Sequence, residues 1–438
     1  MIQRALSYDQ TPPLSVPLRF FLSAPIFLFA AAVLLLWQGP SALVSRWTPA
    51  TLALTHLLTL GFLTMTMIGA MLQILPVVAG IQLFRPHLTA KIVHTLLTIG
   101  SALLASGFWF SQSLLFRLAL LFLVPAFLCL LTVFSIGLRQ KQQSTFSSRS
   151  KSSATVGAMR LAVIALLITV LLGATLASSF AWQNALPMML LTDLHVLWGL
   201  SGWVGLLSIG VAFQVVPMFL VTPLYPVDIT RVLSGTLFML LLLWSVEAVL
   251  ESHWNTMLLS ATIMSGFIVF ATITLYLLAR RKQPKADVTT LFWCTAMASL
   301  FVCAVVWFAQ TAQSHADYVL TLGVLFIIGF AGTLINGMLY KIVPFLLWYH
   351  AQSESPLSSK TVPNIRQLLP EPAALWQFRM HLLALLLLIA ATLLPEALTY
   401  PAALAMCVSS GWLLLNLLNA VRIYTLVRRG TASTLVSA

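Results

Sequence analysis

Twelve apolar stretches of about 20 residues, separated by short polar segments, follow one another along the chain, and this pattern restricts the fold more than any other feature. A helix of about 20 residues crosses a hydrocarbon core of about 30 Å. With 60% hydrophobic and only 8% charged residues, the chain has too little polar surface for a water-soluble protein. The sequence therefore predicts an all-α, polytopic membrane protein with a single membrane domain over residues 1–438.

The first apolar run lacks a convincing small-residue cleavage site, so we expect it to be a retained helix and not a signal peptide. The expected spans are 19–38, 51–82, 91–112, 115–138, 159–181, 188–222, 231–250, 256–280, 288–310, 317–349, 375–395 and 400–427.

Positive charge predicts the orientation of these helices. If the N-terminus is cytoplasmic, 21 of the 23 lysines and arginines fall on the cytoplasmic side, and only Arg46 and Arg117 fall outside. Both termini and the long polar loops 139–158 and 351–374 are then cytoplasmic. The net charge of +13 thus reflects topology, and it is too scattered for nucleic-acid binding. We expect a multi-pass protein of a bacterial inner membrane, surrounded by the lipid bilayer.

One motif occurs three times without a gap, in the expected helices 51–82, 188–222 and 317–349. It reads Gly-aromatic-x6-Gly-x3-(Gln/Lys)-x2-Pro. Successive copies lie 141 and 127 residues apart, about four helices each, which predicts three pseudo-repeats of four helices. The motif residues are Gly61, Gly69, Gln73 and Pro76; Gly202, Gly210, Gln214 and Pro217; and Gly329, Gly337, Lys341 and Pro344.

Each part of the motif has two interpretations. Glycines eight residues apart lie near one helix face, where they allow close approach of a neighbouring helix or of a flat ligand. The prolines break the helical hydrogen-bond ladder and free a carbonyl group. The Gln or Lys one turn earlier either binds that carbonyl as kink support or belongs to a polar path through the membrane.

Two histidines, His56 and His195, stand five and seven residues before the Gly-aromatic pair of the first two copies. On the expected topology both lie just inside the outer membrane boundary. A neutral imidazole in a dry helix bundle is a good ligand for haem iron or copper, provided that its other nitrogen has an acceptor. Thr55 or Thr59 is the expected acceptor for His56, and Asp193 for His195. The alternative is a hydrogen bond across helices without a metal.

The architecture of twelve helices in three groups of four, with histidines at the outer ends of helices 2 and 6, resembles subunit I of the haem-copper oxidases. The N-terminal stretch "RFFLSAPIFLFAAAVLLLW", followed by the helix that carries His56, Gly61, Gly69 and Pro76, is similar to the NnrS-like branch, which is associated with haem, copper and nitric oxide stress. The resemblance implies a low-spin haem b bound through His56, with Gly61 and Gly69 beside it. It also implies a copper ligand at His195.

The sequence departs from the oxidase pattern at three places. Helix 10 carries no histidine between His315 at its start and His350 at its end, helix 7 has only His253 nearby, and Gly199 replaces the tyrosine four residues after the helix 6 histidine. A complete oxygen-reducing site is therefore not expected. A haem would then need His315, another second ligand or an open coordination position, and His253 is a candidate second metal ligand.

The sequence thus predicts a protein that binds haem b, copper or both near the periplasmic face. Its expected role is in redox chemistry, the nitric oxide response or respiratory support, with respiratory-chain or assembly partners. Two alternatives stay open: a cofactor-free transporter or channel that uses Gln73, Gln214 and Lys341 as a polar path, and a copper or haem delivery factor for oxidase assembly.

Overall fold

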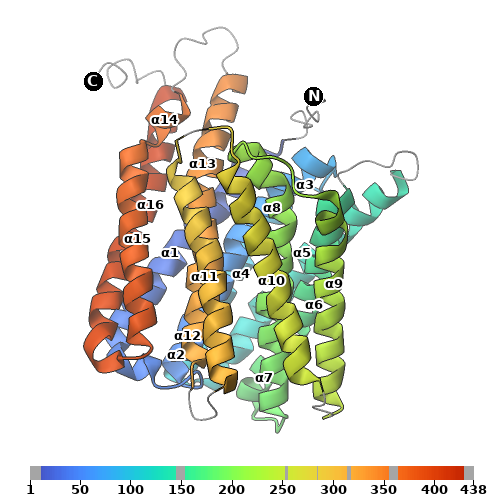
Figure 1. Ribbon diagram of the computed structural model, residues 1–438, viewed down its shortest axis with the longest axis vertical. Coiled ribbons are helices and arrows are strands. Elements are labelled where there is room, and N and C mark those ends of the chain that lie inside the picture. Colours follow the sequence, from blue (N-terminus) through green and yellow to red (C-terminus); the bar gives the residue numbers. More distant parts are fainter. Residues whose placement is uncertain are drawn as a thin grey trace.

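The computed structural model describes residues 11–144, 153–251, 255–283, 285–312, 317–354 and 364–428, and these residues form helices and connecting segments without a strand (Figure 1). Among these residues, twelve helices are long and apolar enough to cross a membrane, so the protein is a polytopic membrane protein. The helical segments are α1 (Ser15–Gln38), η2 (Gly39–Leu43), α2 (Pro49–His56), η3 (Leu57–Thr64), α3 (Met65–Ala79), α4 (Pro86–Phe110), α5 (Ser113–Ser144), α6 (Ser153–Trp182), α7 (Met188–Val196), η5 (Leu197–Leu206), α8 (Leu207–Phe219), α9 (Val227–Val249), α10 (Thr256–Ala279), α11 (Val288–Ala312), α12 (Val319–Val324), η6 (Leu325–Gly332), α13 (Thr333–Glu354), α14 (Ile365–Leu368), α15 (Glu371–Ala391) and α16 (Pro395–Arg428).

The three helices that carry the repeated motif share an internal change of helix type. Each begins as an α-helix, becomes a π-helix around the Gly-aromatic pair, and continues as an α-helix. The three composite helices are α2–η3–α3, α7–η5–α8 and α12–η6–α13. A π-helical stretch is rare and often marks a functional site. The sequence motif therefore coincides with a local backbone feature that its residues alone did not predict.

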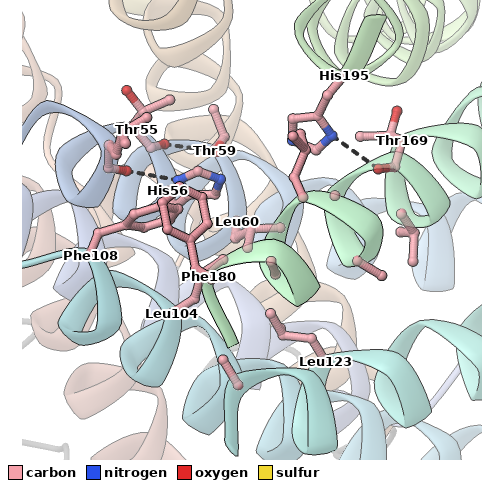
Figure 2. A pocket seen from close by; sticks show the side chains of 18 of the residues that line it. Thr55, His56, Thr59, Leu60, Leu104, Phe108, Leu123, Thr169, Phe180 and His195 are labelled. Carbon is pink, nitrogen blue, oxygen red and sulfur yellow. Dashed lines mark hydrogen bonds between the residues drawn. The ribbon is translucent and has the colours of Figure 1, made fainter. Parts of the chain in front are cut away.

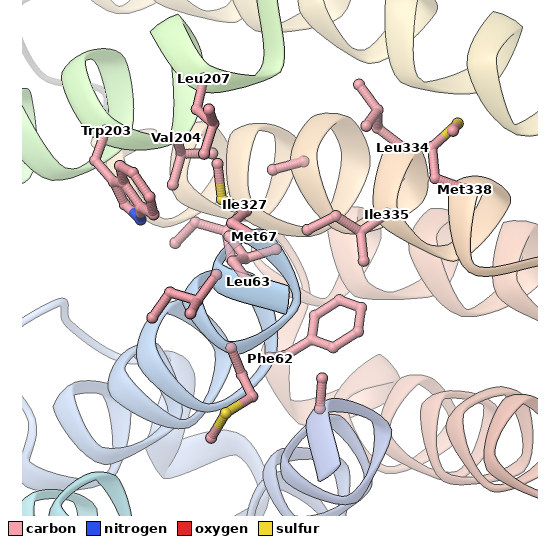
Figure 3. Packing of buried hydrophobic residues seen from close by; sticks show 14 of the residues in the cluster. Phe62, Leu63, Met67, Trp203, Val204, Leu207, Ile327, Leu334, Ile335 and Met338 are labelled. Atoms are coloured by element: carbon pink, nitrogen blue, oxygen red, sulfur yellow. The ribbon is translucent and has the colours of Figure 1, made fainter. Parts of the chain in front are cut away.

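The three composite helices meet at the centre of the bundle (Figure 3), and η6 contacts both η3 and η5. Phe62 of η3 and Trp203 of η5 lie among the buried side chains there. The indole nitrogen of Trp203 donates a hydrogen bond to the Thr64 hydroxyl at 3.1 Å. A buried indole needs such a partner, so this bond fixes η5 against η3.

All six motif glycines pack against a preceding helix. An added Cβ atom at any of them would lie between 2.3 and 2.9 Å from a neighbouring side chain. The contacts are Gly61–Phe27 and Gly69–Phe20 on α1, Gly202–Ala165 and Gly210–Ala158 on α6, and Gly329–Ser299 and Gly337–Phe292 on α11. In each helix pair the partner residues are seven apart. Helix packing is therefore the role that the structure gives these glycines.

The polar positions of the motif lie towards the other end of the composite helices. Pro76, Pro217 and Pro344 are inside α3, α8 and α13. In the described part of the chain, neither Gln73 nor Lys341 donates to a carbonyl group freed by these prolines: the Gln73 side-chain amide forms no hydrogen bond, and Lys341 Nζ binds Asp287 Oδ2 at 2.5 Å. The kink-support interpretation therefore finds no hydrogen bond in its favour, and the polar path stays a prediction.

Asp287, just before α11, gives this ion pair a pH dependence. Burial disfavours the charged carboxylate, but the hydrogen bond and charge of Lys341 and two hydrogen bonds from Thr290 outweigh it and lower the pKa of Asp287 below its ordinary value of 3.8. The resulting stabilisation is present above that ordinary value and is lost as the pH falls through the lowered folded-state pKa.

We expect Asp287→Asn to destabilise the protein by about 1–3 kcal/mol at neutral pH, between the values for exposed and buried ion pairs. Thermal unfolding in detergent at a series of pH values measures this difference. The gap between wild type and variant should stay constant above about pH 5 and close as the pH falls below 3.8 towards the lowered folded-state pKa. A gap that does not close there would show that the carboxylate charge is not responsible.

Candidate functional site

His56 and His195 lie at the end of the bundle opposite to the ends of α1 and α16 where the described chain begins and finishes (Figure 1). His56 is the last residue of α2 and His195 lies in the last turn of α7, each directly before a π-helical stretch. Their imidazole rings have centres 6.4 Å apart and planes inclined by only 21° (Figure 2). The structure thus brings the two histidines, called the histidine pair below, into one site.

Each ring is oriented by a backbone carbonyl group. His56 Nδ1 lies 2.7 Å from the Leu52 oxygen, and His195 Nδ1 lies 3.1 Å from the Thr169 oxygen. A carbonyl oxygen only accepts, so Nδ1 is the donor in both rings, and in a neutral imidazole Nε2 then carries the free lone pair. In the described part of the structure no hydrogen bond reaches either Nε2 atom. Both nitrogens are therefore available as ligands.

The sequence predicted the wrong hydrogen-bond acceptors for the two histidine rings. The Thr59 hydroxyl donates to the Thr55 carbonyl group at 2.7 Å, and neither threonine binds the ring of His56. Asp193 Oδ1 lies 3.1 Å from Arg46 Nη2, in an ion pair that joins the segment before α2 to α7. A local carbonyl group replaces the threonines because His56 Nδ1 reaches back one helical turn, and Arg46 competes for the Asp193 carboxylate.

The histidine pair borders a cavity of about 640 Å³, called the histidine cavity below. Five membrane-spanning helices form it, through α2–η3, α4, α5, α6 and α7–η5. Its walls are mainly apolar, and they include the rings of Phe108, Phe116 and Phe180, which pack against one another. Cavities of about 300–1,000 Å³ with apolar walls and a few polar groups are typical of cofactor and small-molecule sites.

The separation of the two rings fits one metal ion between them. A metal ion lies about 2 Å from an imidazole nitrogen, which is itself about 1 Å from the ring centre, so two ligands on opposite sides place their ring centres about 6 Å apart. The observed separation is 6.4 Å. Across the described residues, no group of three or more His, Cys, Asp or Glu side chains is arranged to hold a metal ion. The protein ligands available here are thus two imidazoles.

The other predicted site residues do not join this pair. His253 and His315 lie outside the described residues. Gly61 and Gly69, expected beside the cofactor, instead face Phe27 and Phe20 of α1 and do not line the histidine cavity. Phenylalanine side chains of α1 already occupy the space beside these two glycines, so no cofactor can lie there.

Two residues of the site carried no recognisable sequence signal. Phe108 of α4 stacks on the His56 ring, with ring centres 5.0 Å apart and planes inclined by 22°. Gly173 of α6 provides room for His195, because an added Cβ atom would lie 2.8 Å from the His195 Cε1 atom. Both act through a ring that they touch, so they are positioning residues for the histidine pair.

We expect Gly173→Val to displace the His195 ring and to weaken metal or cofactor binding about 10- to 100-fold, the range found when the groups that orient a ligand are removed. Gly157 lies on the same helix with open space around its Cα atom, so Gly157→Val is the matched control. Titration of the apoprotein with the ligand measures both affinities. Equal affinities for the two variants would contradict the role of Gly173.

No protein-family model matches the chain, and no curated protein sequence matches it. The function of the site therefore has to be argued from its chemistry.

Proposed function

We propose that the protein binds one b-type haem in the histidine cavity, and that the Nε2 atoms of His56 and His195 would hold its iron. The observation that supports this proposal is the geometry of the histidine pair: near-parallel rings with centres 6.4 Å apart, each with its Nδ1 atom bound to a backbone carbonyl group. The resemblance to the haem-copper oxidase subunit I fold and its NnrS-like branch agrees with His56 as a haem ligand, whereas at His195 it implies copper; the proximity of the two rings is the reason for assigning both to one haem.

The histidine cavity favours haem over a bare ion. A single ion needs only its ligands, whereas a macrocycle needs an apolar space on the scale of the about 640 Å³ found beside the pair. Aromatic walls such as Phe108 and Phe180 suit a flat, apolar ring system. When bound, a haem held by two histidines supplies one-electron redox chemistry. The protein contributes the ligands, their orientation and the exclusion of water.

A copper(I) ion held by the same two nitrogens is the second candidate. The small number of ligands favours copper(I) over zinc. The described residues offer two imidazoles, and no third His, Cys, Asp or Glu side chain is placed to complete a zinc site. A protein that carries copper in this way would deliver it to a respiratory enzyme.

The haem proposal implies a role in redox chemistry, the nitric oxide response or the support of respiratory enzymes, in a bacterial inner membrane. The distribution of positive charge supports an orientation with both chain termini in the cytoplasm and the histidine pair near the periplasmic face. The repeated motif and its three π-helical stretches support an architecture of three four-helix pseudo-repeats.

A reduced-minus-oxidised absorbance spectrum of the detergent-purified protein, together with metal analysis, tests the proposal. We expect a Soret band and about one iron per chain. A colourless protein with about one copper per chain supports the second candidate and contradicts the first. If neither metal is retained, and added haem or copper(I) does not bind saturably, both are wrong.

A further inference from the structure

A second cavity, of about 490 Å³, lies between the three composite helices and is called the central cavity below. Thr55, Val196 and Leu200 line both this cavity and the histidine cavity, so the two are neighbours separated by single side chains. The wall of the central cavity includes side chains from α1, α10, α11 and α12–η6, which do not reach the histidine pair. It is therefore a separate space that the proposed haem site does not use.

The central cavity offers polar groups without a protein partner. Trp307, Ser201 and Thr55 line it, and in the described part of the structure the indole N–H and the two hydroxyl groups of these residues form no hydrogen bond. They come from three different helical segments, α11, η5 and α2. The indole can only donate, whereas a hydroxyl can donate or accept. A ligand with more than one hydrogen-bond acceptor would satisfy them.

The charges at this cavity are already paired. Arg46 and Asp193 also line it, but they form an ion pair with each other at 3.1 Å. A charged ligand would have to break this pair or remain unpaired in an apolar space, which is costly. The remaining wall is largely apolar, with side chains such as Leu35, Ile327 and Leu388. The cavity therefore selects a neutral, apolar molecule.

From these observations we infer that the central cavity binds a membrane-soluble quinone, with its carbonyl oxygens bound by Trp307 and by Ser201 or Thr55. A quinone is neutral, flat and apolar, and carries two acceptors on opposite sides of one ring. These properties match donors placed on separate helices around an apolar space. A hydrocarbon would leave the donors unpaired, and an anion would lack a free positive charge.

One glycine makes the inference directly testable. Gly323 of α12 lines the central cavity, and an added Cβ atom there would meet no atom within 4 Å. Gly323→Leu is therefore expected to fold normally and to fill the cavity from within. Gly235 of α9 likewise has open space around it but does not line the cavity, so Gly235→Leu is the matched control.

Isothermal titration of the full-length protein in detergent with a ubiquinone analogue that carries one isoprene unit is the experiment. We expect saturable binding of about one molecule per chain, unchanged in Gly235→Leu, and at least about tenfold weaker in Gly323→Leu because the space is filled. Trp307→Phe keeps the ring but removes the donor, and should weaken binding about fivefold.

Three results would each overturn the inference: no saturable binding to wild type, equal affinity in Gly323→Leu and wild type, or equal affinity for an analogue of the same shape without the carbonyl groups. The inference is also separable from the haem proposal. His195→Ala should lose the metal and keep its affinity for the quinone, whereas Gly323→Leu should keep the metal and lose the quinone.

Discussion

Replacing His56 with alanine is expected to remove the bound metal or haem from the purified protein, with an affinity loss of at least about 100-fold. The imidazole is proposed as a direct ligand, and even the loss of a group that only orients such a ligand weakens binding about 10- to 100-fold. The Soret absorbance, or the copper content if copper is bound, measures the loss. His195→Ala should give the same result, because either substitution leaves one histidine of the pair without its counterpart.

Three controls make this prediction specific. His87 is exposed, so His87→Ala should keep the full metal content. The double variant His56→Ala/His195→Ala should be no worse than either single variant, because the two residues act as one unit. Free imidazole should restore binding to His56→Gly, since it fits the space that the side chain leaves. Full metal retention in both single variants would exclude the histidine pair as the site.

Apolar runs were sufficient to predict the twelve helices that are long and apolar enough to cross a membrane in the described part of the chain, because apolar content is a local property of the sequence. The first and last residues of these helices were less predictable. The first span was expected at 19–38, whereas the structure extends it over Ser15–Leu43, and the last was expected at 400–427 and covers Pro395–Arg428. Helix ends at the membrane surface depend on capping and on neighbouring loops, which apolar content does not encode.

The π-helical stretches could not be predicted from the motif. A π-helix changes the hydrogen-bond partner of a few backbone groups, and that choice depends on how closely a neighbouring helix approaches. Gly61 and Gly202 signalled the close approach, but their neighbours on α1 and α6 became evident only in the fold. Because the sequence does not show what lies beside a glycine, these glycines suggested ligand contact as well as helix packing.

The two histidines were predictable as site residues because an ionisable side chain inside a membrane is costly and needs a reason. Their partners were not predictable. The acceptors are the carbonyl groups of Leu52 and Thr169, and a carbonyl group has no sequence signature. Gly173 was missed for a related reason, since its importance lies in the absence of a side chain where His195 packs.

Replacing Gly61 with alanine is expected to destabilise the protein by about 3 kcal/mol or more, the upper part of the range for overpacked interiors. The new Cβ atom would lie 2.3 Å from Phe27 Cγ and 2.6 Å from Phe27 Cβ. These atoms are close to the α1 backbone, so a change of rotamer cannot relieve the clash and the helix itself has to move. The midpoint of thermal unfolding in detergent measures the effect.

The matched substitution Gly235→Ala should shift stability in the opposite direction. Gly235 lies in the middle of α9 with open space around it, so alanine should stabilise that helix by up to about 1 kcal/mol through its higher helix propensity. Phe27→Gly removes the opposing side chain, and in a double-mutant cycle it should recover part of the stability lost in Gly61→Ala. If Gly61→Ala were as stable as Gly235→Ala, α1 and η3 would not be in the close contact that the Gly61–Phe27 distances describe.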